Sequence, residues 1–467
     1  MIDRMRFAFV SLTACVAACM ASGASQKPNL VFILADDLGY GDLGCFGQEE
    51  IATPHLDRMA AEGTRFTQAY AGSTVCAPSR CVLMTGLHTG HATVRANQRP
   101  GMTSGYFLDA DDITIARILQ DAGYATAAIG KWGLGMPGIE ATGLPERQGF
   151  DYFFGYLNQS HAHNSYPSHL FRNTTRVNLP NTVPDEQPNG TGVSDNKAVF
   201  AQDLFIDEAL RFLRTPRDEP FFLYFAPTLP HANNESRPFG LEIPNYGFYE
   251  GRDWPEAKKA FAAMVSRLDH DVGRILEALR DPGLAENTLV IFSSDNGPHK
   301  EGGADPELFN SSGAFQGHKR SLHEGGIRAP TIAWQPGVVP AGRTSDAIWY
   351  FPDVLPTFAA AAGVEPPREL DGVNVLPTFH GETQPELSER LLYWEFHERG
   401  FARAVRLGPW KAIQKSPDAP LELYNVVKDP GETHDLARAQ PAIAQKLGAA
   451  MKAAHTPPEN TPVAEGD

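Results

Sequence analysis

LVFILADD, residues 30–37, is a run of six apolar residues that ends in two adjacent carboxylates, Asp36 and Asp37. A continuous apolar run without polar alternation is typical of a strand that is buried on both faces of a sheet. Carboxylates at the carboxyl end of such a strand lie where open α/β sheets bind ligands. The same pair could simply cap the following helix, so its meaning depends on the rest of the chain.

Outward from this strand, helical and strand patterns alternate. Helices are expected at residues 53–63, 112–123, 199–213, 258–279 and 348–362, and buried strands at residues 126–129, 221–225, 288–292 and 329–334. This alternation predicts an α/β fold, with a large mixed, mostly parallel sheet flanked by helices. Residues 158–195, rich in Asn, Pro, Ser and Thr, are expected to form an insertion or a long loop outside the core.

The pattern changes after Pro366-Pro367. Short strands are expected at residues 391–396, 402–407 and 410–413, followed by a terminal helix around residues 443–454. Together they predict a small antiparallel α+β subdomain. We therefore expect a catalytic domain at residues 26–370 and a C-terminal subdomain at residues 371–467, with the last dozen residues disordered.

The first 25 residues are expected to be an export signal. Arg4 and Arg6 precede an apolar run, residues 7–18, that is too short to span a bilayer. The protein is therefore expected in the periplasm or outside the cell. A lipobox-like tetrad that ends at Cys19 leaves a lipid anchor as an alternative. No second apolar run approaches membrane-spanning length.

Charge and cysteine content narrow the function classes. A net charge of -16 over 467 residues argues against nucleic acid and anionic membrane surfaces as partners. It does not exclude a small anionic substrate, because a local basic pocket decides that question. Of five cysteines, Cys45, Cys76 and Cys81 lie outside the expected signal, so there is no disulfide framework. Whether Cys45 and Cys81 pair stays open.

The stretch STVCAPSRCVLMTG, residues 73–86, combines a thiol with a guanidinium one helical turn later. Arg80 can donate two hydrogen bonds to two oxygens of a tetrahedral anion. Cys76 could equally be a buried cysteine at the start of a core helix, because C-x-P-x-R alone is a weak signal.

A second set of oxygen ligands follows another expected strand. Asp295-Asn296-Gly297 comes directly after the apolar residues 289–292, and by itself it would most often be a turn. Together with Asp36 and Asp37, it offers three carboxylates and an amide carbonyl from two strand ends. Such a hard oxygen cage suits Ca²⁺ or Mg²⁺ and not zinc.

The longer pattern of Cys76, Pro78, Ser79 and Arg80, followed by Thr85-Gly86, resembles the signature of the formylglycine-dependent sulfatases. The resemblance extends from about Pro28 to the terminal helix and is closest to the arylsulfatase A and N-acetylgalactosamine-6-sulfatase types. It implies an alkaline phosphatase-like fold and the hydrolysis of sulfate esters. It also implies that a formylglycine-generating enzyme oxidises Cys76, which then acts as a hydrated aldehyde.

The resemblance also implies roles for individual residues. The metal ligands would be Asp36, Asp37, Asp295, Asn296 and the modified Cys76, around one ion that is usually calcium, with Mg²⁺ a less expected alternative. The groups that contact the sulfate ester would be Arg80, Lys131, His231 and Lys319. Each of these basic residues, taken alone, would more often be a solvated or structural side chain. Their joint occurrence in the family order favours the catalytic interpretation.

The sequence departs from the family pattern at Gly133, where a histidine commonly lies two residues after the signature lysine. Either another residue takes the place of that histidine, with His161 and His163 as the nearest candidates and His88 and His91 behind them, or the chain works without it. A substrate-binding role for His161 and His163 is the better hypothesis. A zinc site at His161 and His163 is disfavoured, because neither a cysteine nor a third histidine accompanies the pair.

These observations predict an exported sulfatase that acts on a sulfated carbohydrate. The nearest rival is a phosphonate monoesterase or phosphodiesterase of the same superfamily, which can share the Cys-x-Pro-Ser-Arg stretch. Lys131 and Lys319 argue against that rival. An inactive carbohydrate-binding homologue is a further alternative, although the full set of expected site residues is present. The sequence does not predict the sulfated sugar or the oligomeric state.

Overall fold

The computed structural model describes residues 27–98, 106–136, 138, 142–280, 283–398 and 400–457. The expected export signal, with Arg4, Arg6 and Cys19, and most of the expected disordered tail lie outside these residues. None of the helices in the described ranges is long and apolar enough to cross a bilayer.

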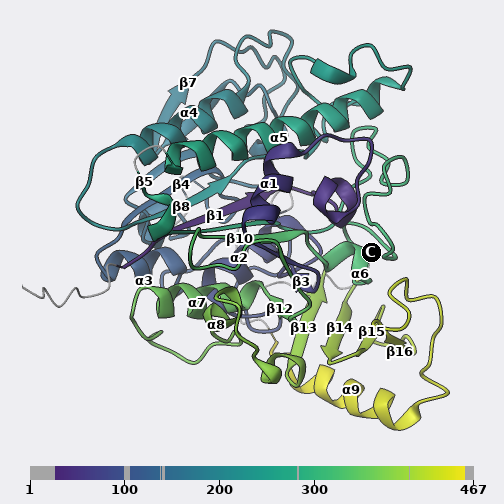
Figure 1. Cartoon of the computed structure of the whole chain (residues 1–467). Helices are drawn as coiled ribbons and strands as arrows, with labels where there is room; N and C mark the ends of the chain where they lie inside the picture. The colour runs from purple at the N-terminus through teal and green to yellow at the C-terminus, as the bar shows by residue number, and fades with distance from the viewer. Residues whose placement is uncertain are drawn as a thin grey trace, which may run out of the picture.

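A ten-stranded sheet forms the centre of the molecule (Figure 1), and its strand order is β11-β2-β10-β9-β1-β8-β4-β5-β6-β7. Five neighbouring strands are parallel: β9 (Thr288–Ser294), β1 (Asn29–Ala35), β8 (Phe221–Ala226), β4 (Ala125–Lys131) and β5 (Tyr152–Tyr156). One edge continues with β10 (Thr331–Trp334), β2 (Thr64–Phe66) and β11 (Arg343–Ser345), and the other with β6 (His169–Arg172) and β7 (Thr175–Asn178). The predicted mixed, mostly parallel sheet is confirmed.

Helices cover both faces of this sheet, because the central strand is apolar on both sides. Val31 and Ile33 of β1 pack in the core that includes α1 (Pro54–Glu62), α4 (Ala201–Arg214) and α5 (Glu256–Arg280). Leu30, Phe32 and Leu34 pack in the opposite core, with α2 (Cys76–Thr85), α3 (Ile115–Asp121), α7 (Val354–Ala361) and α8 (Leu376–Phe379). Figure 1 shows the two groups of helices above and below the strands.

The strand β10 runs antiparallel to β9, which makes the sheet mixed as predicted. Two details differ from the sequence prediction. Residues 348–362 begin with a short strand, β12 (Trp349–Tyr350), which pairs with β3 (Ala69–Tyr70), and become helical only in the following turn and α7. Residues 158–195 are not wholly a loop outside the sheet, because β6 and β7 form a hairpin that extends it. Strands of only four residues carry too little alternation to be recognised among polar neighbours.

Short 3₁₀ turns connect many of these elements. They are η1 (Tyr40–Asp42), η2 (Gly44–Phe46), η3 (Pro145–Gln148), η4 (His161–His163), η5 (Gly247–Tyr249), η6 (Ala285–Asn287), η7 (Phe351–Asp353) and η8 (Pro385–Ser388). The turn η4 holds the two histidines of the predicted substrate loop.

The C-terminal residues form the predicted antiparallel sheet beside the main body (Figure 1, yellow-green). Its strands are β13 (Leu391–Phe396), β14 (Ala402–Leu407), β15 (Trp410–Gln414) and β16 (Glu422–Asn425), in that order. The last of these was not predicted, because its four residues show no clear alternation. The helix α9 (Pro441–Ala453) packs on one face of the sheet, and the other face packs on the main body.

A buried ion cluster ties this small sheet to the main body. Lys411 Nζ of β15 lies 3.0 Å from Glu324 Oε1 of α6 (Glu324–Ile327) and 3.0 Å from Glu432 Oε1. Glu324 also accepts hydrogen bonds from Tyr70 (2.6 Å) and Arg328 (3.0 Å). We call these five residues the Lys411 cluster. Burial alone would raise the pKa of Glu324, but Lys411 and Arg328 outweigh it and lower that pKa to about 2.

Candidate active site

The predicted site residues converge at one edge of the main sheet. Asp36 and Asp37 follow β1, Asp295 and Asn296 follow β9, Lys131 ends β4, and His231 follows β8. Because these strands are parallel, their carboxyl ends meet at the same edge. Cys76 opens α2, Arg80 lies one turn later in that helix, and Lys319 comes from the loop before α6. These nine residues are the Cys76 cluster.

The backbone at Asp37 lets two consecutive carboxylates face the same centre. Successive side chains of an extended strand point to opposite faces, but Asp37 adopts a left-handed conformation with φ 68° just after β1 ends. As a result, Cys76 Sγ lies 3.4 Å from Asp36 Oδ1 and 3.6 Å from Asp37 Oδ1. The Asp37 amide donates to Asp295 Oδ1 at 3.1 Å, which joins the ends of β1 and β9.

Three cations are bound to the three carboxylates. Arg80 donates to Asp295 Oδ2 through Nη2 (2.7 Å) and Nε (3.0 Å). Lys131 Nζ donates to Asp36 Oδ2 at 2.8 Å, and Lys319 Nζ donates to Asp37 Oδ2 at 2.6 Å. The side chains of all six residues are buried. Buried charges of this kind are tolerated only when they are paired, so each cation and its carboxylate partner stay charged only in the presence of the other.

His231 has a defined orientation. Its Nδ1 lies 2.6 Å from the Ala232 carbonyl and must donate to it, which leaves Nε2 as an acceptor 3.3 Å from Lys319 Nζ. Burial, together with the Lys319 charge, holds the pKa of His231 well below its ordinary value. The ring of His163 stacks on His231, with centroids 5.1 Å apart and planes 11° from parallel.

The Cys76 side chain is a neutral thiol in this environment. Burial, reinforced by the carboxylates of Asp295 and Asp37, holds the pKa of Cys76 well above its ordinary value. Burial would also raise the pKa of Asp36, but the charges of Lys131 and Arg80 outweigh it and hold that pKa well below the usual range. The thiol therefore lies beside ionised carboxylates and is a poor nucleophile as it stands.

The oxygen donors of the cluster fit a hard divalent cation. Asn296 donates through Nδ2 to Asp37 Oδ1 (2.7 Å) and to the Gly297 carbonyl (2.8 Å). Its Oδ1 is buried and accepts no hydrogen bond from any residue that the structure describes. A buried acceptor without a hydrogen bond is unfavourable unless a cation binds it. With the carboxylates of Asp36, Asp37 and Asp295, it forms a donor set suited to Ca²⁺ or Mg²⁺.

The two histidines predicted to bind substrate are separated by the structure. His163 faces the Cys76 cluster through its stacking on His231, and it lies 3.2 Å from Glu235 Oε1. His161 is 1% exposed and packs against Tyr156 and His169 instead. In a 3₁₀ turn, residues two apart point in very different directions.

Further histidines and cysteines that the sequence singled out lie outside the Cys76 cluster. His88 and His91 stack on each other beside Asp371, whose carboxylate lies 3.0 Å from His91 Nδ1. Cys45 packs on one face of the main sheet and Cys81 on the other, so they do not pair, and both are free within the described part of the chain.

At Gly133, the position where the family commonly has histidine, the nearest side chain is Gln159. A Cβ on Gly133 would lie 3.2 Å from Gln159 Oε1 and 3.7 Å from Arg80 Cδ. The Gln159 oxygen is buried and accepts no hydrogen bond within the described ranges. Position 133 therefore borders the cluster, and Gln159 fills the space beside it.

Several residues at the rim of the site were not predicted. Arg320, which follows Lys319, forms an ion pair with Glu301, and its Nε lies 3.7 Å from Glu398 Oε2. Glu398, at the tip of the β13–β14 hairpin, accepts a hydrogen bond from the Asn97 amide at 3.0 Å. The C-terminal sheet thus reaches the rim of the Cys76 cluster. The adjacent basic pair Lys319-Arg320 was the one sequence signal for this contact.

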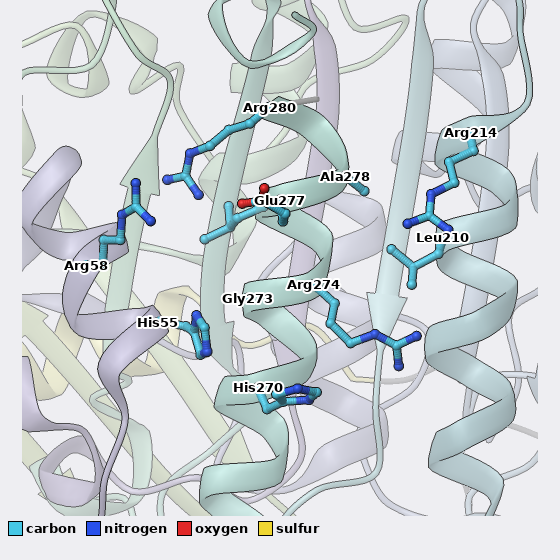
Figure 2. Close-up of a pocket in the computed structure, with 11 residues that line it drawn as sticks. His55, Arg58, Leu210, Arg214, His270, Gly273, Arg274, Glu277, Ala278 and Arg280 are labelled. Atoms are coloured by element: carbon cyan, nitrogen blue, oxygen red, sulfur yellow. The ribbon is translucent and has the colours of Figure 1, made fainter. Parts of the chain in front are cut away.

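A hollow of about 560 Å³ lies elsewhere, on the outer face of α5 between α1 and α4 (Figure 2). No member of the Cys76 cluster lines it. Arg58 and Arg280 point toward one another there, and both bind Glu62, while Arg274 binds Asp207. Three of the four arginines that line the hollow therefore already have carboxylate partners, and Arg214 is the fourth.

Comparison with known proteins relates the whole chain to sulfatases. A family model described as sulfatase matches residues 28–364, and one described as N-sulphoglucosamine sulphohydrolase, C-terminal, matches residues 313–455. The chain is 35% identical to human N-acetylgalactosamine-6-sulfatase, covering 84% of this chain and 72% of that protein. It is 33% identical to human arylsulfatase A, covering 94% and 89%. The fold matches the crystal structure of Ps i-CgsB in complex with k-i-k-neocarrahexaose, with a TM-score of 0.77, 28% identity, and coverage of 93% and 94%.

Proposed function

The chain belongs to the sulfatase family and is a sulfuric ester hydrolase, and on that premise we propose that it removes sulfate from a carbohydrate with the help of a formylglycine at position 76 and one calcium ion. The observation that carries this proposal is the placement of Cys76 Sγ within 3.6 Å of both Asp36 and Asp37. The same cluster holds an arginine, two lysines and a histidine.

A formylglycine at position 76 and a calcium ion each have residues that fit them. Oxidation of Cys76 by a formylglycine-generating enzyme would supply an aldehyde hydrate, whose hydroxyl is the nucleophile toward sulfur and whose second hydroxyl allows sulfate to be released. Calcium, held by Asp36, Asp37, Asp295 and Asn296 with the modified residue 76, would supply positive charge that polarises this nucleophile.

The side chains of the cluster supply binding and proton transfer. Arg80, Lys131 and Lys319 bind the three carboxylates in this structure. They are the buried donors that would turn to the sulfate oxygens when a cation takes over the carboxylates, and their charges would stabilise the negative charge that develops in the transition state. His231 presents an unprotonated Nε2 next to the Lys319 ammonium. The Lys319 ammonium carries a proton beside His231 Nε2, so the two residues together are placed to protonate or shield the departing alcohol.

A carbohydrate ester is the substrate class that the neighbouring segments support. The name of the human relative, N-acetylgalactosamine-6-sulfatase, and the neocarrahexaose complex of the similar crystal structure both point to sugars. In this chain, His163 and Glu398 approach the cluster from the 158–200 segment and from the β13–β14 hairpin. Polar side chains on two sides of the nucleophile suit the hydroxyl-rich faces of a sugar.

Gln159 is the residue that we assign to the place of the usual family histidine. Its side-chain oxygen is buried beside Gly133 and Arg80 and lacks a hydrogen-bond donor among the described residues. An aldehyde hydrate carries hydroxyl groups that can donate to such an acceptor. Gln159→Leu, which keeps the size of the side chain, should therefore lower kcat on aryl sulfate about tenfold, within the range of one catalytic hydrogen bond.

We also propose that the N-terminal residues export the protein from the cytoplasm. Arg4, Arg6 and the apolar residues 7–18 fit a signal that directs the chain to the periplasm or the medium. Sequencing the N-terminus of the mature protein tests this, and cleavage that leaves Cys19 first, with a fatty acid attached, would identify the lipid-anchored form.

The test of the activity compares nitrophenyl sulfate, phenyl phosphonate and a panel of defined sulfated mono- and oligosaccharides. We expect release of sulfate from at least one sugar and little turnover of the phosphonate. Faster phosphonate hydrolysis would favour the monoesterase alternative, and the lack of any sulfate release by protein with formylglycine at position 76 would favour a binding protein. Mass spectrometry of the peptide that contains residue 76 decides whether the cysteine has been converted.

A further inference from the structure

Three potential ligands lie together in the segment that follows β5, outside the Cys76 cluster. His161 belongs to η4, His169 is the first residue of β6, and Glu186 lies in the loop after β7. Their ligand-capable atoms all lie within 4.8 Å of one another. His161 and His169 are 1% and 7% exposed, and the Glu186 side chain is 23% exposed. We call these residues the His161 cluster.

His161 is the unusual member of this cluster. Both of its ring nitrogens are buried, and neither makes a hydrogen bond of normal geometry with any described residue. The backbone of His169 is near enough to affect the pKa of His161 but does not complete such a bond. A neutral imidazole always carries one N–H donor and one acceptor, and burying both without partners is unfavourable. The ring is packed between the edge of Tyr156 and Gly190 and cannot turn to solvent without moving them.

The other two ligands already share a polar contact. His169 Nδ1 lies 3.1 Å from Glu186 Oε1, and the Ser168 hydroxyl donates to the same oxygen at 2.5 Å. Ligand atoms around a tetrahedral zinc ion are about 3.3 Å apart, given bonds of roughly 2.0–2.1 Å. The His169 and Glu186 atoms are therefore near the separation that zinc requires. The His161 ring lies against the His169 ring, with centroids 4.4 Å apart, and offers the third ligand within 4.8 Å.

We propose that His161, His169 and Glu186 bind one Zn²⁺ ion, with water in the fourth position. Two imidazoles and one carboxylate are a ligand set for zinc and not for calcium, which takes oxygen ligands. Arg176 is the charged neighbour on the open side, with Nη2 3.9 Å from Glu186 Oε2. It can stay on this outer oxygen while Oε1 binds the metal.

The site would stabilise the segment that carries His163. His161 and His163 belong to the same 3₁₀ turn, and His163 stacks on His231. A metal ion that joins η4 to β6 and to the 186 loop would hold the His163 ring in place without touching the substrate. Its role is to position this histidine, and occupancy should affect KM for a sugar sulfate more than kcat.

The other histidine cluster offers a matched comparison. His88, His91 and Asp371 are also close enough to hold a metal ion, but their polar atoms already have partners. Asp371 binds the His88 amide and the His91 ring, and the Gly90 amide donates to His88 Nδ1. This second cluster therefore needs no ion to satisfy it.

Zinc binding is tested on full-length protein that has been stripped with a chelator and reloaded with Ca²⁺. The Cys76→Ser background removes the competing thiol. We expect one equivalent of Zn²⁺ by calorimetry, and with Co²⁺ the visible absorption of a tetrahedral complex. Glu186→Gln and His169→Asn should each weaken binding at least about tenfold, whereas His91→Asn should leave it unchanged.

A further variant keeps the test valid if a ligand substitution unfolds the segment. His161→Phe replaces the unpartnered imidazole by an apolar ring, so it should fold, raise Tm in the absence of zinc, and lose the Co²⁺ absorption. The absence of stoichiometric binding to the parent protein would overturn the proposal, as would unchanged binding in His161→Phe. Because binding is read directly, failure of the zinc site and failure of the sulfatase assignment are distinguishable.

Discussion

The Cys76 cluster and the Lys411 cluster both bury ammonium groups against carboxylates, but they differ in what is left without a partner. Lys411 lies 3.0 Å from each of two glutamates, and Tyr70 and Arg328 complete the coordination of Glu324. In the Cys76 cluster, Asn296 Oδ1 has no donor among the described residues, and a thiol lies among the carboxylates.

This difference distinguishes an ion cluster with a structural role from one in which a bound cation could replace the present ion pairs. The Lys411 cluster joins two sheets and offers nothing further to a ligand. In the Cys76 cluster, a cation at Asn296 would compete for Asp36 and Asp37, and the lysines that now bind them could turn to a sulfate group. The acceptor without a partner in the Cys76 cluster is a neutral amide oxygen beside a thiol, whereas Glu432 Oε1 of the Lys411 cluster, which also accepts no hydrogen bond from the described residues, lies 3.0 Å from the Lys411 ammonium.

The largest change in activity relative to the parent protein is expected from Cys76→Ser. Loss of the proposed nucleophile should lower kcat on nitrophenyl sulfate by at least about 10³-fold, because an unoxidised serine has no second hydroxyl with which to release sulfate. The free energy of unfolding should change little, since the buried side chain keeps nearly the same size. Release of nitrophenol from purified protein provides the measurement, and turnover close to that of the parent would contradict the scheme.

Lys411→Met, in contrast, should lower the stability of the protein and leave its activity nearly unchanged. Removing the ammonium leaves two buried glutamates without their cation, so the free energy of unfolding should fall by about 3–5 kcal/mol. The kcat of the fraction that remains folded should stay near that of the parent. Denaturant unfolding checks this against Lys415→Met, whose partly exposed pair with Glu422 should cost less than about 1 kcal/mol. Equal losses in the two variants would show that the Lys411 cluster does not act as a clamp.

Calcium should stabilise the functional cluster in a way that depends on Asn296. At a concentration about 100 times its Kd, Ca²⁺ should add about 2.7 kcal/mol to the free energy of unfolding. Asn296→Ala should lose most of this gain, because it removes the acceptor that lacks a donor. Thermal unfolding of chelated and reloaded samples gives the comparison, and an equal calcium effect in both proteins would exclude Asn296 as a ligand.

The smallest effect is expected from His163→Ala. Loss of the ring stacked on His231 should raise KM for a sugar sulfate about fivefold, which corresponds to roughly 1 kcal/mol. Turnover of the small aryl sulfate and the calcium content should change little. Parallel kinetics on both substrates test the assignment, and an equal loss on both would place His163 in the common chemistry and not in sugar binding.

Much of the site could be predicted because its residues follow buried strands. The apolar run before Asp36 predicts a central strand, and the parallel order of β1, β4, β8 and β9 then brings their ends together. The separation of His161 from His163 could not be predicted, since it depends on a 3₁₀ turn that the sequence does not mark. The β6–β7 hairpin was missed because such short strands take their pairing from tertiary context.

The complete burial of Cys76 also constrains the order of events during biosynthesis. Its side chain is 0% exposed, at the first turn of a helix enclosed by the main sheet. If this cysteine is oxidised as proposed, the modifying enzyme must reach it while the surrounding polypeptide is still unfolded. Export and oxidation would then compete for the same short-lived nascent chain.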